Sequence, residues 1–202
     1  PIILSTGMND LQSIRNTIKV INKYDCPLAI MHCTSMYPTP FKKVRLRAIE
    51  VLKKNFPNAV VGLSDHSLGI ETGLGAVSLG GSIIEKHFTL STRWSGPDNI
   101  ISITPTLLKR LIKESKNIWE SLDDDLSILK EEKPVINFAY ASVVATRNIK
   151  KNDIFNYDNI WIKRPGNGEI LSKDLKRVIG KKAKRDISVN KQISPLDIIN
   201  FK

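Results

Sequence analysis

The chain has 202 residues, of which 41% are hydrophobic, and its formal net charge at pH 7 is +11. This length and apolar fraction suffice for one sizeable domain and a second, smaller one. No apolar run approaches the roughly 18–20 residues that would cross a bilayer, so we expect no membrane span and no membrane partner. The two cysteines, Cys26 and Cys33, lack disulfide-framework or metal-cluster spacing, and a reducing, cytoplasmic setting is therefore expected.

The positive charge is concentrated near the carboxyl end. Residues 147–202 contain 14 Lys and Arg against six Asp and Glu, a net charge of +8. Such a stretch can mark a nucleic-acid surface. Aromatic residues make up only 6% of the chain, however, and no recognisable binding module accompanies the charge. We therefore expect no nucleic-acid partner, and interpret the charge as a solvated surface or as attraction for an anionic small molecule.

The first half of the chain alternates strand-like and helix-like segments. Short apolar runs predict strands at 2–5, 28–33, 60–63 and 82–85, and helical spacing predicts helices at 10–22, 43–55, 68–80 and 105–119. Thr104 is a plausible N-cap for the last helix, and Pro105 suits its first turn. Four βα units form either a small open sheet with helices on both faces or half of a (β/α)₈ barrel, which takes about 250 residues.

The start of the chain favours the half barrel. A buried-type strand begins at residue 2, with no initiator Met and no polar lead-in. We therefore expect the chain to begin inside a longer protein.

The composition changes after about residue 120. Residues 121–137 are polar and carry a proline, which is typical of a linker. Beyond them, residues 141–146, 159–163 and 178–180 are short β-like pieces separated by Lys, Asn, Asp and Gly turns. We therefore predict an α/β domain at 1–120, a linker at 121–137 and a small β-rich domain at 138–202.

All three histidines, His32, His66 and His87, lie at predicted strand ends. A lone histidine near a strand is more often structural, but the carboxyl ends of neighbouring parallel strands converge on one spot. Imidazoles suit Mn²⁺, Fe²⁺, Co²⁺ and Zn²⁺, and two of them leave positions open for Lewis-acid chemistry. We therefore predict His66 and His87 as metal ligands, with Asp65 and Glu85 as hydrogen-bonding partners that orient the rings. His32 is expected to line the pocket.

Hydroxyl groups also lie at strand ends, on Ser5, Ser35 and Ser64, where they commonly hold phosphate or carboxylate oxygens. Strand ends are rich in serine in any case, so an ordinary structural role stays open for each. Asp98 and Arg164 lie on predicted turns, where an ordinary solvated position is about as plausible as a binding role.

Six motifs occur in order along the chain: Ser5-Thr-Gly-Met8, His32-Cys-Thr-Ser-Met-Tyr-Pro-Thr-Pro40, Leu63-Ser-Asp-His66, Glu85-Lys-His-Phe-Thr89, Gly96-Pro-Asp98 and Lys163-Arg-Pro-Gly166. Together they closely resemble the N-acetylneuraminate (sialic acid) synthase family, over essentially the whole chain. The resemblance implies the C-terminal half of a (β/α)₈ TIM barrel, its last four βα units, followed by a small β-rich SAF domain of the β-clip, antifreeze-like type.

The resemblance implies an enzyme that forms a C–C bond, a transferase that condenses phosphoenolpyruvate with N-acetylmannosamine to give N-acetylneuraminate and phosphate. It implies a divalent metal, Mn²⁺ or Mg²⁺, held by His66 and His87, which polarises the aldehyde of the sugar. Ser5 and Ser64 match positions that contact phosphoenolpyruvate. Ser35 stands where some members have Asn, so its match is weaker.

The same resemblance implies a sugar site. Tyr37 and Asp98 match sugar-binding positions, while Phe138 and Arg164 match positions that reach the sugar from the partner subunit of a domain-swapped homodimer. The phosphate-binding lysines and the acid/base carboxylate belong to the first half of the barrel, which this sequence lacks. The chain alone is therefore expected to be inactive.

Two alternatives stay open at this point. Synthases of legionaminic or pseudaminic acid would carry nearly the same motifs, because the choice of acceptor depends on a few loop residues. A non-catalytic sugar- or ice-binding module built on the SAF domain is the alternative from another functional class. The two metal-type histidines argue against it, since such a module has no use for them.

Overall fold

The computed structural model describes residues 1–201, which form two compact units. Unit 1 comprises Pro1–Asp124 and unit 2 begins at Asp125. The division falls within the segment 121–137 that the sequence predicts as a linker. Each unit is described by itself below.

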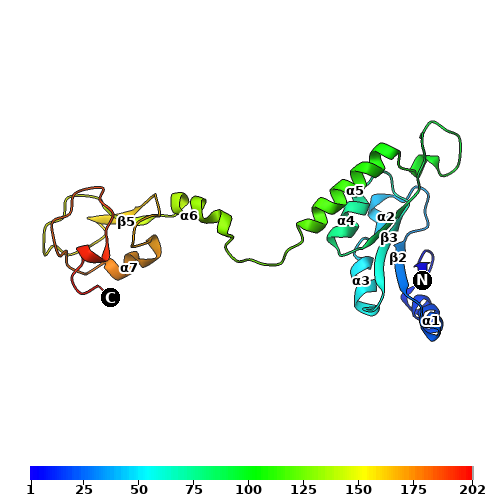
Figure 1. The fold of residues 1–202 in the computed structure, drawn as a ribbon, viewed down its shortest axis with the longest axis horizontal. Coiled ribbons are helices and arrows are strands. Elements are labelled where there is room, and N and C mark those ends of the chain that lie inside the picture. The colour runs from blue at the N-terminus through cyan, green and yellow to red at the C-terminus, as the bar shows by residue number, and fades with distance from the viewer. Residues whose placement is uncertain (202) are drawn as a thin grey trace. The chain divides into compact units, whose positions relative to one another are not determined.

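Unit 1 is built on a four-stranded parallel sheet (Figure 1). Its strands are β1 (Ile2–Ser5), β2 (Leu28–Cys33), β3 (Val60–Asp65) and β4 (Ile83–Lys86), in the spatial order β1-β2-β3-β4. All four predicted strands are confirmed to within two residues. Each strand lies beside the one that follows it in sequence, which is the order that successive βα units give in a barrel wall.

Five α-helices belong to the described part of unit 1: α1 (Leu11–Ile21), α2 (Phe41–Val44), α3 (Ala48–Asn55), α4 (Glu71–Ser78) and α5 (Pro105–Glu120), with 3₁₀ turns at Asn22–Tyr24 and Asn99–Ile101. Asp10 caps α1 by accepting a hydrogen bond from the Ser13 amide. The predicted helix 43–55 is divided into α2 and α3, because Arg45 adopts a left-handed conformation with φ +57° that no α-helix tolerates.

The helices of unit 1 pack on one face of the sheet. Ile30 of β2 and Leu63 of β3 are buried against residues of α1, α3 and α4, and Ile84, the register partner of Leu63, packs against residues of α4 and α5. Register partners point to the same side of a parallel sheet. The open sheet with helices on both faces is therefore wrong, and the sheet of unit 1 is that of a half barrel.

Within unit 1, none of the described helices covers the opposite face of the sheet, called the inner face below. On the edge strand β1, Ile3 is 62% exposed. Further in, the Met31 side chain lies over Gly62, where a Cβ atom would stand only 2.7 Å from its sulfur. The absence of a side chain at this position lets Met31 lie against the sheet.

Unit 2 has a two-stranded antiparallel sheet, β5 (Ser142–Ala145) and β6 (Ile160–Lys163), held among loops by isolated bridges. Helix α6 (Lys133–Ala139) precedes it, and α7 (Leu175–Val178) follows it (Figure 1). Short 3₁₀ turns span Lys130–Glu132, Ser172–Asp174 and Pro195–Asp197. Its core is a continuous cluster around Phe155, which is fully buried.

Two predictions for this region are corrected. The segment 121–137 is not wholly irregular, since Pro134 stands in the first turn of α6, where proline is tolerated. The piece 178–180 is not a strand, because Val178 ends the helical turn α7 and Gly180 has φ +84°. Within residues 1–201, none of the helices combines the length and the hydropathy that crossing a membrane requires.

Candidate active site

His66 and His87 meet at the carboxyl end of the sheet. Strand β3 ends at Asp65 and β4 at Lys86, so each histidine directly follows its strand. The two strands are hydrogen-bonded neighbours, and the ring centroids of the histidines lie 5.3 Å apart with an interplanar angle of 60°. The predicted convergence of the two imidazoles is confirmed.

The ring of His66 is held from the β2 side. Its Nδ1 lies 3.2 Å from the carbonyl oxygen of Thr34 and 3.8 Å from the sulfur of Cys33. A carbonyl oxygen can only accept, so Nδ1 donates and carries the proton. In the neutral ring the lone pair is then on Nε2, which is the arrangement of a histidine that ligates a metal.

Tyr37 and Asp98 complete the surroundings of the two rings. The Tyr37 ring stacks on His66 at a centroid distance of 4.2 Å and meets His87 edge-on at 6.1 Å. Asp98 Oδ2 lies 3.8 Å from His87 Nδ1. The structure thus gathers one aromatic ring, two imidazoles and one carboxylate at a single place.

Ser64 and Glu85 lie one layer below, on the same inner face. They are register partners, and the Ser64 hydroxyl donates to Glu85 Oε1 at 2.7 Å. Together with the two histidines they contribute to the wall of a pocket of about 210 Å³. The carboxylate of Glu85 is therefore in the pocket, but its hydrogen-bonding partner in the structure is Ser64 and not an imidazole.

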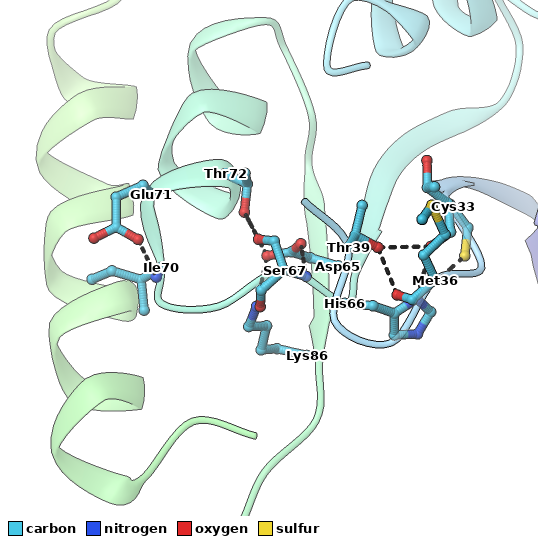
Figure 2. Close-up of polar contacts among 11 residues, drawn as sticks. Cys33, Met36, Thr39, Asp65, His66, Ser67, Ile70, Glu71, Thr72 and Lys86 are labelled. Carbon is cyan, nitrogen blue, oxygen red and sulfur yellow. Dashed lines mark hydrogen bonds and ion pairs between the residues drawn. The ribbon is translucent and has the colours of Figure 1, made fainter. Parts of the chain in front are cut away.

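Asp65 makes no direct hydrogen bond to either histidine ring, contrary to the prediction. Side chains of consecutive strand residues point to opposite faces, so Asp65 faces the helices while His66 faces the pocket. Its carboxylate accepts hydrogen bonds from Lys86 Nζ at 2.8 Å, from the Thr72 hydroxyl at 2.6 Å and from the Ser67 amide at 2.8 Å. Figure 2 shows this network beside His66.

His32 also faces the helices, so the expectation that it lines the pocket is wrong. Only 4% of its surface is exposed, and its Nε2 donates to the carbonyl oxygen of Val44 at 2.6 Å. Burial lowers the pKa of His32, while the Val44 carbonyl opposes this shift and the nearby Arg45 charge adds to it. His32 is a buried neutral residue of the helix-facing layer.

The other two predicted serines, Ser5 and Ser35, make no direct contact with either histidine ring among the hydrogen bonds of the described residues. Ser5 is the register partner of Met31 on the exposed edge strand β1, which puts it one layer below Ser64 and Glu85. The hydroxyl of Ser35 lies 3.9 Å from the Cys33 sulfur, which in turn contacts His66. The contacts with phosphoenolpyruvate expected of both serines stay predictions.

Phe138 and Arg164 belong to unit 2. Phe138 is in the last turn of α6 and 70% exposed. The Gly166 amide donates to the Asn137 carbonyl at 2.9 Å, which fastens the turn after Arg164 to the end of α6. The two residues predicted to reach the sugar thus flank one hydrogen-bonded junction, and their role towards a partner subunit stays a prediction.

Comparisons with known proteins agree with this architecture. Residues 1–126 match the model of the NeuB family, and residues 140–199 match that of the SAF domain. The chain belongs to the NeuB family. Its NeuB part contains Tyr37, both pocket histidines and Asp98, and the SAF part contains Arg164.

Three NeuB relatives illustrate the similarity. An uncharacterised protein of Methanocaldococcus jannaschii is 42% identical, over 92% of this chain and 55% of its own length. The N,N'-diacetyllegionaminic acid synthase of Campylobacter jejuni is also 42% identical, over 83% of this chain and 51% of its own. The crystal structure of the N-acetylneuraminic acid synthetase of Leptospira borgpetersenii matches 66% of this chain and 47% of its own, with a TM-score of 0.62 and 36% identity.

This chain spans about half the length of the curated relatives it matches. Other relatives bear the names pseudaminic acid synthase and N-acetylneuraminate-9-phosphate synthase. The named relatives are thus synthases of sialic-acid-type sugars that differ in product.

The donor set of this NeuB chain fits a divalent metal only in part. No group of three or more His, Cys, Asp and Glu residues within residues 1–201 is arranged to hold an ion. Two imidazoles on one ion, with metal–nitrogen bonds of about 2.1 Å, have ring centres roughly 4.5 to 6 Å apart, and the observed separation is 5.3 Å. The pair therefore suits two positions of a coordination sphere, with the others open to water or substrate.

Sequence reasoning missed the partners that hold His66, namely Cys33 and the Thr34 carbonyl, and it missed Lys86. A contact with a backbone carbonyl cannot be predicted from the sequence, because every residue has that group. Lys86 could have been noticed, because it stands between Glu85 and His87 at a strand position that alternation directs into the apolar helix-facing layer. A lysine there requires a buried carboxylate as its partner.

Proposed function

We propose that this chain is part of a metal-dependent synthase of sialic-acid-type sugars, which condenses phosphoenolpyruvate with N-acetylmannosamine to N-acetylneuraminate and phosphate. The observation that supports this proposal most is the His66–His87 pair at the carboxyl ends of adjacent strands, with Tyr37 and Asp98 beside it. The NeuB and SAF matches support the proposal, because they give the family of synthases in which we assign the histidine pair a role.

His66 and His87 would hold Mn²⁺ or Mg²⁺, which when bound supplies Lewis-acid polarisation of a substrate carbonyl. Tyr37 packs on the His66 ring and restricts the directions from which a sugar can approach. Asp98 offers a carboxylate to sugar hydroxyls next to His87. Ser64, hydrogen-bonded to Glu85, presents its hydroxyl to the pocket floor, where the phosphoenolpyruvate carboxylate or phosphate would lie, and Ser5 and Ser35 lie near the same face.

Groups outside this chain complete the proposed site. The chain spans about half the length of its relatives, and the inner face of its sheet lacks helical cover. We place the phosphate-binding cations and the acid/base group on the other half of a TIM barrel, and we place Phe138 and Arg164 at the sugar of a partner subunit in a domain-swapped, cytoplasmic homodimer. The isolated chain is accordingly inactive.

A second candidate product is N,N'-diacetyllegionaminic acid. It is favoured by the 42% identity with the Campylobacter jejuni synthase of that name. The acceptor would then be a sugar with two acetamido groups. The same histidine pair would serve either acceptor, since a metal held there would act on the part of the sugar that reacts and not on the part that differs.

The metal site is tested on the 202-residue chain with Mn²⁺ alone. Titration followed by electron paramagnetic resonance is expected to show one site, lost in His66→Ala and in His87→Ala. His32→Gln is the matched control, because His32 also lies near the carboxyl end of a strand, one residue before the end of β2, but faces the helices. Binding that survives both alanine substitutions overturns the metal assignment.

The reaction is tested by complementation. The chain is mixed with the part of the Campylobacter jejuni relative that it does not cover, and phosphate release from phosphoenolpyruvate is followed with each acceptor. Release by the mixture and not by the chain alone supports the proposal, and the preferred acceptor identifies the product. Release by the chain alone contradicts the expected inactivity, and a stable complex without release for either acceptor overturns the function.

A further inference from the structure

Next to His66, on the helix-facing side of the sheet, lies a buried charged network (Figure 2). Lys86 Nζ lies 2.8 Å from Asp65 Oδ2, and the two side chains are 4% and 1% exposed. Lys86 also donates to the Ser67 carbonyl, while Thr72 donates to Asp65. The partners in the network come from β3, β4, the segment that joins β3 to α4, and the first turn of α4.

Packing alone does not require charges at this place. Two residues earlier on the same face, Leu63 of β3 and Ile84 of β4 are register partners, and this apolar pair fits the layer between sheet and helices. Buried ion pairs carry a large desolvation cost, and replacing them by apolar residues of similar volume is often neutral or stabilising. The ion pair therefore calls for a role other than stability.

The position of the pair indicates that role. Asp65 and Lys86 are the last residues of β3 and β4, and they are the last register partners of these two strands. His66 and His87 are the next residues, so no ladder position ties one histidine to the other. The ion pair is consequently the last cross-strand link before the two rings.

The network also holds the chain on the far side of His66. Asp65 Oδ1 accepts from the Ser67 amide at 2.8 Å, and Lys86 Nζ donates to the Ser67 carbonyl. The backbone of His66 thus lies between two residues that are both fixed to the ion pair. The backbone of His66 is also held directly, because its carbonyl oxygen accepts a hydrogen bond from the Thr39 amide at 2.9 Å.

We propose that the Asp65–Lys86 ion pair is a positioning device that sets the separation and orientation of the His66 and His87 imidazoles. This inference deepens the proposed function and rests on the histidines being metal ligands. Both residues belong to the lining of the pocket, but their side chains are buried in the helix-facing layer, so the proposed effect on the rings passes through the backbone that joins each residue to its histidine. Substitution of groups that hold metal ligands in place typically lowers metal affinity 10- to 100-fold.

The test uses the 202-residue chain with the double variant Asp65→Asn/Lys86→Met. Removing both charges avoids an unpaired buried charge, which in either single variant can prevent folding, and the introduced amide oxygen can still accept from the Ser67 amide. Asp197→Asn/Arg185→Met is the matched control, since it removes another ion pair with a fully buried carboxylate, in unit 2. Circular dichroism confirms that each variant folds.

Two readouts distinguish positioning from simple stabilisation. The Mn²⁺ dissociation constant is expected to rise 10- to 100-fold in the Asp65/Lys86 variant and to stay within twofold in the control. Without metal, nuclear Overhauser contacts between the rings of His66 and His87 are expected to weaken or vanish in the first variant and to persist in the second.

Unchanged affinity and unchanged ring contacts, with only a lower melting temperature, overturn the inference. A wild-type chain that does not bind Mn²⁺ overturns the metal site instead. The ring contacts then decide separately whether the ion pair positions the histidines.

Discussion

The two units of this chain differ in how completely their cores are enclosed. Unit 2 is the shorter, yet its main cluster contains twelve buried hydrophobic residues, whereas the main cluster of unit 1 contains nine, among the described residues. In unit 2 the cluster encloses Phe155, whose side chain is fully buried. In unit 1 it lies between one face of the sheet and the helices, and Ile3 on the other face is 62% exposed.

The core of unit 2 is thus covered by unit 2 itself, whereas one face of the sheet in unit 1 has no helices packed on it within that unit. A closed cluster supplies its own cooperativity, whereas an apolar face and an unpaired strand edge invite association with another chain. We therefore expect unit 2 to fold independently and unit 1 to depend on whatever covers its inner face. The predictions below test this contrast, from the largest expected effect to the smallest.

The largest effect is expected from Phe155→Ala. Removing a fully buried aromatic side chain costs about 3–5 kcal/mol in folding free energy, which is enough to unfold a small domain. In a Trp94→Phe/Trp119→Phe background, Trp161 reports on unit 2 alone, and urea unfolding followed by its fluorescence measures the loss. A loss below about 1 kcal/mol contradicts the closed core.

A pair of isoleucines compares the two faces of the sheet in unit 1. Ile30→Ala removes a residue with 0% exposure from the helix-facing core and is expected to cost about 2–5 kcal/mol. Ile3→Ala on the inner face is expected to change stability by less than about 0.5 kcal/mol. Urea denaturation followed by circular dichroism compares them, and equal losses would show that the inner face is already covered in solution.

Acid stability of unit 2 is expected to depend on Asp197. Burial tends to raise the pKa of its carboxyl, but the Ser194 amide, the Arg185 guanidinium, the Ser194 hydroxyl and the Lys191 charge together hold that pKa below the ordinary value of 3.8. The contribution of Asp197 is therefore present above pH 3.8 and lost as the pH falls through the lowered pKa.

In Asp197→Asn, unit 2 is expected to lose about 1–3 kcal/mol at neutral pH and to show a flatter decline of stability in acid. Thermal melts between pH 2 and pH 7, followed by Trp161 fluorescence in the background above, measure both effects. A variant whose pH profile parallels that of the parent chain would contradict this role of Asp197.

The smallest effect is expected from His32 in unit 1. Its pKa is lowered by burial, so the unfolded chain takes up a proton at a higher pH than the folded one. The contribution of neutral His32 is therefore present above its unfolded pKa of about 6.5 and lost as the pH falls below it. His32→Gln, which keeps a donor for the Val44 carbonyl, should flatten the stability of unit 1 between pH 5 and pH 7, as measured by urea titration; an unchanged slope would contradict it.

Much of the fold of unit 1 was predictable, because apolar runs followed by amphipathic segments have few other solutions. The strands predicted at 28–33 and 60–63 and the helix predicted at 10–22 are examples. In unit 2 the local signal is weaker. Val178 and Ile179 have the β-branched composition of a strand, yet Leu175–Val178 forms a helical turn, since packing around Phe155 outweighs propensity.

The site was predictable to a similar extent. That His66 and His87 converge follows from their places after two adjacent parallel strands, which the sequence shows directly. That Asp65 turns away follows from strand alternation once β3 is known to extend to Asp65, whereas the sequence pattern predicted its end at residue 63. An error of two residues in a strand end is enough to misassign a side chain to the wrong face.

The sequence by itself thus determined the order of strands and helices in unit 1, the division into two units and the meeting of two histidines, because these depend on periodicity and on neighbours along the chain. Only the tertiary structure decided that the helices cover one face, that Lys86 pairs with Asp65 and that the Thr34 carbonyl lies within hydrogen-bonding distance of Nδ1 of His66. These features depend on contacts between distant residues and on backbone groups, which every residue carries and no sequence distinguishes.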